Sequence, residues 1–504
     1  MPTAPPAPDH DITIIGAGFS GIGIAIALTE AGLTDLQLIE EGEDFGGTWY
    51  WNRYPGIAVD IPSYSYEYSF APNDDWSRTY APGRELLRYA RQVADRHRLR
   101  ERTRFGERVT AATFDEDTDA WTVTTTAGTF TTRTLIDATG VLTVPKDPDI
   151  PGLATFAGRT VHTARWDDGV ELAGRRVGII GTGASAIQVI PEIAPEVAHL
   201  TVFQRTPIWC LPRPDYPLPA AGRSLVARIP FAHKTARLAA HAFVEMTFVI
   251  PAHWSRQLRL TKQFEKRGRR FIAKQVEDPE LREKLTPQYG LGCKRPSFHN
   301  SYLSTYNRDN VTLETDPIAE IVPEGVRTES GTVHELDVLI LATGFKVWDS
   351  GNFPKFPVTG AGGGDLEEWW RANRYRAYEG VAMPGFPNYF LMFGPYGYNG
   401  ASYFTLVEAQ ARHITRCLRH ARDEGATRVE VTAEAADRFF AEMMRKRTGQ
   451  VFWQDSCSLA NSYYFSDDGD VPLRPALTMQ VFRRAKTYPL EDYALSGRAG
   501  AAAT

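Results

Sequence analysis

Two glycine-rich turns have the residue types and spacing of dinucleotide-binding turns. The first, Gly16-Ala-Gly18-Phe19-Ser-Gly21, lies between a β-branched run at 11–15 and an apolar run at 22–29. This order predicts a strand, a tight turn and a helix, which together place backbone N–H groups and a helix N-terminus around a pyrophosphate. We therefore expect Gly16, Gly18, Phe19 and Gly21 to contact a nucleotide cofactor.

The second turn repeats this design further along the chain. Gly181-Thr182-Gly183-Ala184-Ser185-Ala186 lies between apolar runs at 176–180 and 187–193. A single pattern of this kind is a weak signal, because tight turns without a ligand also contain it. Two copies, each between a predicted strand and a predicted helix, favour two nucleotide sites, the second formed by the turn at 181–185.

The strand after each turn ends in a residue of different charge. Glu40 lies 24 positions after Gly16, and Arg205, followed by Thr206, lies 24 positions after Gly181. An acid at this place accepts hydrogen bonds from ribose hydroxyls, whereas an arginine suits a 2′-phosphate. The first unit is therefore expected to bind FAD or NAD, and the second to bind NADP.

The composition is that of a large globular protein. The chain has 504 residues, of which 43% are hydrophobic and 23% charged, enough for two or three domains. With 56 Lys and Arg against 61 Asp and Glu, the formal net charge is −5. This balance argues against a protein built to bind nucleic acid. The sequence predicts no oligomeric state, and a monomer is compatible with it.

The cysteines and the apolar segments indicate the cellular compartment and whether the chain inserts into a membrane. The four cysteines form no Cys-x-x-Cys pair, so neither a metal site nor a dithiol redox centre is expected. So few cysteines in this length predict a reducing compartment and no disulfide framework. The most apolar segment, 239–254, is interrupted by Glu245 and Pro251 and is too short to span a bilayer, and residues 1–8 do not form a signal-peptide pattern. We expect a cytoplasmic protein without stable membrane insertion.

Two further segments resemble each other and predict how the domains connect. Leu135-Ile-Asp-Ala-Thr-Gly140 and Leu339-Ile-Leu-Ala-Thr-Gly344 each consist of an apolar strand that ends in a flexible turn, which suits a hinge. The predicted fold is α/β, with two Rossmann-like domains, the second inserted into the first. The predicted bounds are 1–145 and 345–504 for the first domain, 146–344 for the second, and about 214–290 for a helical insertion in the second. The insertion is rich in Lys and Arg, which we interpret as solvated helix surface.

Two longer motifs are more specific than the glycine turns. One is Phe156-Ala-Gly158-Arg-Thr-Val-His162-Thr-Ala-Arg-Trp166-Asp167, and the other is Gly47-Thr48-Trp49-Tyr-Trp-Asn-Arg-Tyr54-Pro55-Gly56-Ile-Ala-Val-Asp60. At these residues the chain resembles the type I Baeyer–Villiger monooxygenases, flavoproteins that insert an oxygen atom beside a ketone carbonyl. The resemblance extends from about Asp11 to about Pro472 and so covers nearly the whole chain.

The resemblance implies a reaction and its cofactors. Members of the family bind FAD tightly, use NADPH to reduce it, and form a C4a-peroxyflavin with molecular oxygen. This species attacks the carbonyl of a small-molecule ketone, and the adduct rearranges to an ester or a lactone. The flavin supplies the difficult chemistry, and the protein supplies orientation, charge and exclusion of water.

The resemblance also implies roles for individual residues. Gly47, Thr48, Trp49, Tyr66 and, through its backbone, Phe404 would contact FAD. Lys294 would bind the NADP 2′-phosphate together with Arg205. Arg295 would be the active-site arginine, and Asp60 would orient it beside the flavin.

Other interpretations remain open from the sequence. His162 could be a general base, but a lone histidine without a paired carboxylate favours a structural role on the interdomain linker. A flavin monooxygenase of soft nucleophiles would use the same two nucleotide units. A disulfide reductase would lack its dithiol, and a nucleotide-sensing regulator would bind the cofactors without turnover. The loop at 461–464 departs from the family pattern, because Tyr463 stands where the family commonly has Trp.

Overall fold

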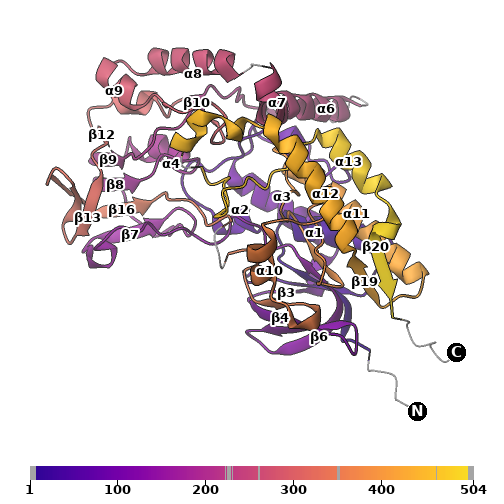
Figure 1. Cartoon of the computed structure of the whole chain (residues 1–504). Helices are drawn as coiled ribbons and strands as arrows, with labels where there is room; N and C mark the ends of the chain where they lie inside the picture. Colours follow the sequence, from indigo (N-terminus) through magenta and orange to yellow (C-terminus); the bar gives the residue numbers. More distant parts are fainter. Residues whose placement is uncertain are drawn as a thin grey trace.

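The computed structural model describes residues 7–221, 223, 229, 231–258, 261–348, 352–460 and 462–497. Asn461 of the predicted loop, part of the predicted helical insertion and the two chain ends lie outside these ranges. Two large β-sheets form the framework, and helices cover them (Figure 1). The α/β class predicted from the sequence is confirmed.

The first sheet is built around the strand that precedes the first glycine turn. This strand, β1 (His10–Ile15), pairs in parallel with β2 (Leu36–Ile39) and β6 (Thr129–Asp137), and its apolar side chains are buried. Across the sheet, in order, lie β17 (Val358–Thr359), β4 (Val109–Asp115), β5 (Ala120–Thr125), β6, β1, β2 and β3 (Thr103–Arg104), with β18 (Tyr389–Leu391) also paired to β6. Strands from before residue 140 and from after residue 350 therefore share one sheet.

The second sheet is parallel throughout and is built around the strand before the second glycine turn. That strand, β8 (Arg176–Ile180), has the predicted bounds. The order across the sheet is β12 (Val311–Glu314), β9 (His199–Phe203), β8, β16 (Val338–Leu341) and β7 (Arg159–His162). A small antiparallel sheet follows β12 along the chain and contains β13 (Ile318–Val322), β14 (Gly325–Thr328) and β15 (Val333–Glu335).

The repeated Ala-Thr-Gly segments lie against the two glycine turns. Gly16 has φ +101°, and a Cβ there would come within 2.7 Å of the carbonyl oxygen of Ala138. Gly181 has φ +113°, and a Cβ there would come within 2.5 Å of the carbonyl oxygen of Ala342. The same close approach in both units explains why these glycines and these strand ends recur together.

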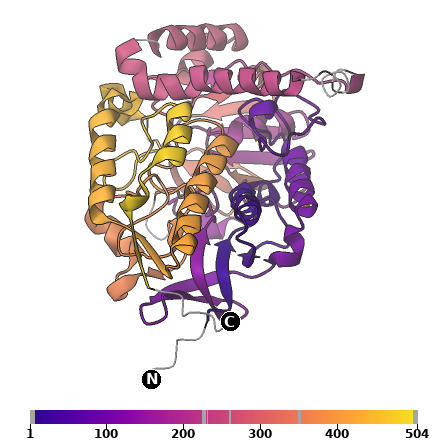
Figure 2. The same cartoon turned by 90° about the vertical axis from the view of Figure 1, so that its right-hand side faces the viewer.

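Helices pack on both sheets. After the first turn, α1 (Phe19–Glu30) is buried along most of its length, and it packs against the long α11 (Tyr403–Asp423). Figure 2 shows α11 and its neighbours standing beside the first sheet. The other helices in the part of the chain that forms the first sheet are α2 (Thr48–Trp51), α3 (Gly83–Arg96), α10 (Leu366–Asn373), α12 (Ala433–Lys446) and α13 (Thr478–Thr487). Two short strands, β19 (Arg428–Val431) and β20 (Tyr493–Ser496), pair with each other.

Most of the described part of the predicted insertion is helical. Its helices form a layer above both sheets in Figure 1. They are α6 (Ala232–Val244), the π-helical turn η4 (Glu245–Val249), α7 (Ile250–Leu258), α8 (Thr261–Gln275) and α9 (Pro279–Lys284); α4 (Ala186–Ile193) follows the second glycine turn, and β10 (Cys210–Leu211) pairs with β11 (Ser297–Phe298). Among the described residues, no helix is both long enough and apolar enough to cross a bilayer.

Candidate active site

Arg295 and Asp60, which the resemblance placed together, form an ion pair. Arg295 Nε donates a hydrogen bond of 2.6 Å to Asp60 Oδ2. The Arg295 side chain is 18% exposed and the Asp60 side chain 43%, so the guanidinium is largely enclosed and its partner stays in contact with solvent. Burial opposes the charge of Arg295, but the carboxylate of Asp60 and the nearby tyrosines raise its pKa well above the ordinary value.

Two more residues hold the guanidinium, and sequence reasoning missed both. Arg295 Nη1 donates a hydrogen bond of 3.1 Å to the hydroxyl oxygen of Tyr398, which lies in the loop before α11. The guanidinium carbon lies 4.5 Å from the ring centroid of Phe248 on the π-helical turn η4. A π-helical turn often marks a functional site, and this signal is structural, since no residue pattern of 245–249 indicates it.

The segment that carries Asp60 is anchored by the second nucleotide unit. Gln188 on α4 donates from Nε2 to the carbonyl oxygen of Ala58 at 3.0 Å, and its Oε1 accepts a hydrogen bond of 3.2 Å from the Tyr54 hydroxyl. Gly56 has φ +78°, and a Cβ there would come within 2.6 Å of the Gln188 carbonyl oxygen. The Pro-Gly turn before Asp60 is thus fitted to α4 by close backbone approach.

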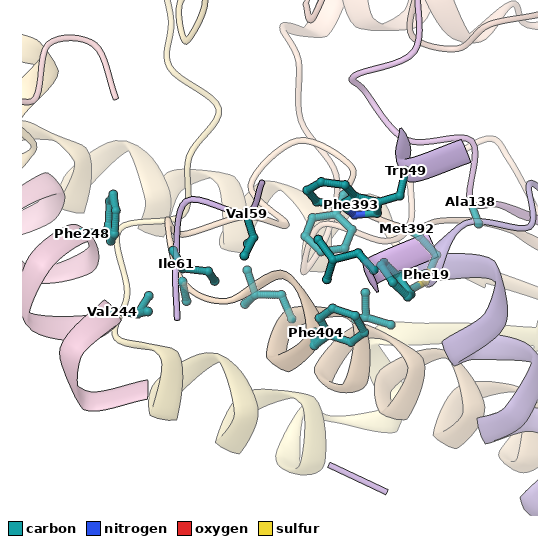
Figure 3. Packing of buried hydrophobic residues seen from close by; sticks show 14 of the residues in the cluster. Phe19, Trp49, Val59, Ile61, Ala138, Val244, Phe248, Met392, Phe393 and Phe404 are labelled. Atoms are coloured by element: carbon teal, nitrogen blue, oxygen red, sulfur yellow. The ribbon is translucent and has the colours of Figure 1, made fainter. Parts of the chain in front are cut away.

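The predicted flavin contacts on aromatic residues are brought together. Phe19 and Tyr66 each pack against Phe404, with ring centroids 4.5 and 4.9 Å apart, and Trp49 packs edge-on against Tyr66 at 5.8 Å. Trp49 Nε1 also donates a hydrogen bond of 3.2 Å to the Tyr66 hydroxyl. Figure 3 shows Phe19, Trp49 and Phe404 on one side of Val59 and Ile61, with Phe248 on the other side. Asp60 is thus carried by the segment between this aromatic group and Phe248.

The remaining residues of the first unit surround the first glycine turn. The buried carboxylate of Glu40 accepts hydrogen bonds of 2.7 Å from the backbone N–H groups of Ala17 and Gly42. Burial raises the pKa of Glu40, and those two N–H groups partly offset the effect. Gly18 and Gly47 approach so closely that a Cβ on Gly47 would lie 2.8 Å from the Gly18 Cα. This glycine-lined backbone fits a group that must approach the main chain, such as a pyrophosphate.

Thr48 lies beside this backbone at the start of α2. Its Oγ1 accepts a hydrogen bond of 3.2 Å from Asn52 Nδ2, which also donates to its carbonyl oxygen at 2.8 Å. Gly21 lies against the backbone of Gly16, where a Cβ would come within 1.9 Å of the Gly16 carbonyl oxygen. The first turn of α1 therefore requires glycine at position 21.

The second unit brings two positive charges near each other, those of Arg205 and Lys294. Arg205 is exposed after β9, and its charge adds to burial in lowering the pKa of Lys294 to about 8. Thr182 Oγ1 donates to the Thr206 carbonyl oxygen at 2.9 Å, which joins the glycine turn to the Arg205 segment. A Cβ on Gly183 would meet no atom within 4 Å, so the turn is open at this residue. Two cations beside an open glycine turn fit a phosphorylated nucleotide.

His162 bridges two segments through hydrogen bonds at both ring nitrogens. Its Nδ1 accepts a hydrogen bond of 3.0 Å from the backbone N–H of Ala164, and its Nε2 lies 3.2 Å from Thr343 Oγ1, in the second Ala-Thr-Gly segment. Burial lowers the pKa of His162. Beside it, the Arg165 guanidinium carbon lies 4.5 Å from the ring centroid of Trp51 on α2. These contacts join the linker to the segment after β16 and to α2.

The cysteine prediction is wrong in one respect. Cys293 and Cys457 form a disulfide, with Cα atoms 5.0 Å apart and a sequence separation of 164 residues. This pairing could not be predicted, because no short spacing joins the two cysteines and only the fold brings them together. Cys210 and Cys417 are buried free thiols. The bond ties the segment that carries Lys294 and Arg295 to the one that precedes the predicted loop.

Comparisons with known proteins agree with this geometry. The family described as pyridine nucleotide-disulphide oxidoreductase matches residues 13–218. A Baeyer-Villiger monooxygenase of Streptomyces coelicolor is 35% identical over 485 residues, covering 96% of this chain and 92% of the relative. The structure of OTEMO in complex with FAD and NADP aligns with a TM-score of 0.86 at 30% identity, over 97% of this chain and 100% of that one. Cyclohexanone monooxygenase from Rhodococcus sp. Phi1 bound to NADP⁺ aligns with a TM-score of 0.85 at 31% identity, over 96% of this chain and 99% of that one.

Proposed function

Because this chain belongs to the Baeyer–Villiger monooxygenases, it converts ketones to esters or lactones with FAD, NADPH and molecular oxygen, and we propose that Arg295 and Asp60 are its catalytic residues. The observation that carries this proposal is the hydrogen bond between Arg295 and Asp60. Asp60 is flanked by Val59 and Ile61, which belong to the same buried cluster as Phe19 and Phe404.

The chemistry of the proposed pair follows from its charge and geometry. FAD, once reduced by NADPH, supplies the activation of oxygen. Oxygen insertion places negative charge on the attacking oxygen and then on the former carbonyl oxygen of the ketone. A guanidinium stabilises such charge well because it stays protonated and its N–H donors are rigid. Asp60 accepts from Nε and thereby orients the guanidinium toward the site.

We propose that the first unit holds FAD. Gly16, Gly18 and Gly21 would receive the pyrophosphate, Glu40 the ribose hydroxyls, and the aromatic group the isoalloxazine ring system. The proposed contacts are Gly16, Gly18, Phe19, Gly21, Glu40, Gly47, Thr48, Trp49, Asp60, Tyr66 and Phe404. The close approach of Gly18 to Gly47 supports this assignment. Neither residue has a side chain that would cover the main-chain N–H groups there.

We propose that the second unit holds NADPH. Gly181, Thr182, Gly183, Ala184 and Ser185 would receive its pyrophosphate at the start of α4. Arg205, Thr206 and Lys294 would bind the 2′-phosphate. The lowered pKa of Lys294 supports the assignment, because a dianionic phosphate between Lys294 and Arg205 would relieve the repulsion that lowers it.

The domain division and the location are also proposals. We propose an FAD domain at 1–145 and 345–504 and an NADP domain at 146–344, since the strands of each sheet come from these ranges. We propose a cytoplasmic location, and the disulfide makes it testable. Thiol alkylation in intact cells before lysis would show whether Cys293 and Cys457 are reduced there.

The experiment for the function uses the purified enzyme with bound FAD. It is incubated with NADPH and air and with a panel of cyclic, linear and aryl ketones, and products are scored for a mass gain of one oxygen. We expect ester or lactone from at least one ketone class, with little hydrogen peroxide when that ketone is present. An organic sulfide and a tertiary amine serve as comparison substrates. Oxidation of these alone, with no ketone product, would contradict the proposed pair. Oxygen transfer to a sulfide or amine forms no oxyanion from a carbonyl group, so it does not need the cation.

A further inference from the structure

We propose that Tyr398 is a positioning residue for Arg295: its hydroxyl oxygen holds Nη1 while Asp60 holds Nε, so that Nη2 is the donor presented to the reacting oxygen. The inference rests on the proposed role of Arg295. Arg295 Nη1 donates to the Tyr398 hydroxyl at 3.1 Å, and Nε donates to Asp60 Oδ2 at 2.6 Å. Among the hydrogen bonds of the described residues, Arg295 donates from Nε and Nη1, and no bond from Nη2 occurs.

The three contacts of Arg295 restrict different movements of its guanidinium. A bond to Nε alone would leave the group free to tilt about that bond. A second bond to Nη1, from a segment 103 positions away, fixes the guanidinium in its own plane. The Phe248 ring, 4.5 Å from the guanidinium carbon, covers one face and limits movement out of that plane.

The loop that carries Tyr398 is itself held rigidly. The Tyr398 carbonyl oxygen accepts a hydrogen bond of 2.8 Å from the backbone N–H of Arg474. The next residue, Asn399, donates from Nδ2 to the Ala476 carbonyl oxygen at 3.0 Å, and its own carbonyl oxygen lies 2.7 Å from His253 Nε2. A fixed acceptor can fix its donor, whereas a mobile loop could not.

A neutral acceptor is the chemically suitable choice at this position. Burial raises the pKa of Tyr398, although the charge of Arg295 acts against it, so the phenol stays protonated at neutral pH. A second carboxylate would add another negative charge beside a guanidinium that Asp60 already pairs. That charge would compete with the oxyanion of the reaction. A phenol orients the cation and leaves its positive charge available to the oxyanion.

The test removes one oxygen atom. Tyr398→Phe keeps the ring and deletes the acceptor for Nη1. We expect the variant to retain FAD and to be reduced by NADPH at the parent rate within twofold. The ester formed per NADPH consumed should fall about tenfold, the scale of one hydrogen bond to a charged group, with hydrogen peroxide making up the difference. A purely structural role would not shift this product ratio at constant flavin reduction.

A matched control lies in the same loop. Tyr396 donates its hydroxyl to Asp470 at 3.0 Å and is not bonded to Arg295. Tyr396→Phe removes the same atom from the same residue type, so its product ratio should equal that of the parent even if its melting temperature falls. An equal loss of coupling in both variants would overturn the inference, because the effect would then come from the loop and not from Arg295.

A second background separates this inference from the function on which it rests. In Arg295→Lys the Nη1 donor is absent, so adding Tyr398→Phe should change the product ratio less than twofold. If Arg295→Ala abolishes ester formation while Tyr398→Phe leaves coupling at the parent level, the role of Arg295 stands and the inference fails. If Arg295→Ala forms ester normally, the proposed function of the pair fails first.

Discussion

Arg295 Nε lies 2.6 Å from Asp60 Oδ2, although the two residues are 235 positions apart. Asp60 follows a turn that packs on α4 of the second nucleotide unit, and Arg295 lies just before β11. The pair therefore joins a segment of the proposed FAD domain to a segment of the proposed NADP domain. A change in how these domains meet would alter the site without altering any residue in it.

Arg295→Ala should separate flavin reduction from oxygen insertion. We expect the variant to keep FAD and to be reduced by NADPH, because reduction requires only the two cofactors in contact. It should form no ester and should release hydrogen peroxide, because the developing oxyanion loses its cation. Stopped-flow flavin absorbance measures reduction by NADPH, and product mass measures oxygen insertion. Asp60→Ala should show the same pattern less completely, and substantial ester from Arg295→Ala would remove the residue from the catalytic role.

Arg205→Ala should reduce the preference for NADPH. Loss of a hydrogen bond to a charged phosphate costs about 1.5–3 kcal/mol, so kcat/KM for NADPH should fall about 10- to 100-fold, with little change for NADH. Arg270→Ala, an exposed arginine on α8, is the matched control and should leave both values unchanged. Equal kcat/KM for the two coenzymes in the parent enzyme would contradict the assignment of the second unit.

The affinity for NADPH should depend on pH through Lys294. Its pKa is lowered to about 8 in the free enzyme, so the ammonium is present below that pH and is lost above it. Binding of a phosphate favours the protonated form, and the Kd for NADPH should therefore rise as pH increases through 8. Fluorescence titration between pH 6.5 and about 9.5 measures this dependence. Lys294→Arg should show a flatter profile, and a parent profile without any rise above pH 8 would exclude Lys294 from the phosphate site.

Removal of the disulfide should lower stability. A cross-link over 164 residues restricts the unfolded chain, and the chain-entropy model gives a contribution of about 5 kcal/mol. We expect Cys457→Ser to unfold at a lower temperature than the parent, measured by calorimetry without reductant. Dithiothreitol should lower the Tm of the parent and leave that of Cys457→Ser unchanged. A parent that is insensitive to reductant would show that the bond contributes no stability.

His162→Ala should impair turnover without loss of FAD. The ring connects the backbone at Ala164 to Thr343, so the variant should lose contact between two segments and should not lose a proton acceptor. Retention of the flavin spectrum together with reduced ester formation is the expected result. A pH–rate profile of the parent with an ionisation that disappears in His162→Ala would instead assign the residue to proton transfer.

The sequence predicted the nucleotide units well because their signals are local. The strand at 176–180 is predicted at the bounds that β8 has, since an apolar run beside a glycine turn determines both strand and turn. Contacts between residues far apart in the sequence could not be predicted in this way. Tyr398 reaches Arg295 across 103 positions, and Cys293 reaches Cys457 across 164, so no spacing rule indicates either contact. Phe248 was missed for a different reason, because its place depends on a π-helical turn that its residues do not specify.

The disulfide also closes a covalent ring in the chain. The backbone from Cys293 to Cys457, closed by the sulfur–sulfur bond, is a covalent ring. Arg295 and Tyr398 lie within this ring, and Asp60 lies on the tail that precedes it. A single proteolytic cut inside the ring leaves both ends attached, whereas a cut between Asp60 and Cys293 releases the piece that carries Asp60. Fragment sizes on gels with and without reductant would therefore reveal whether a cleavage separates the two members of the ion pair.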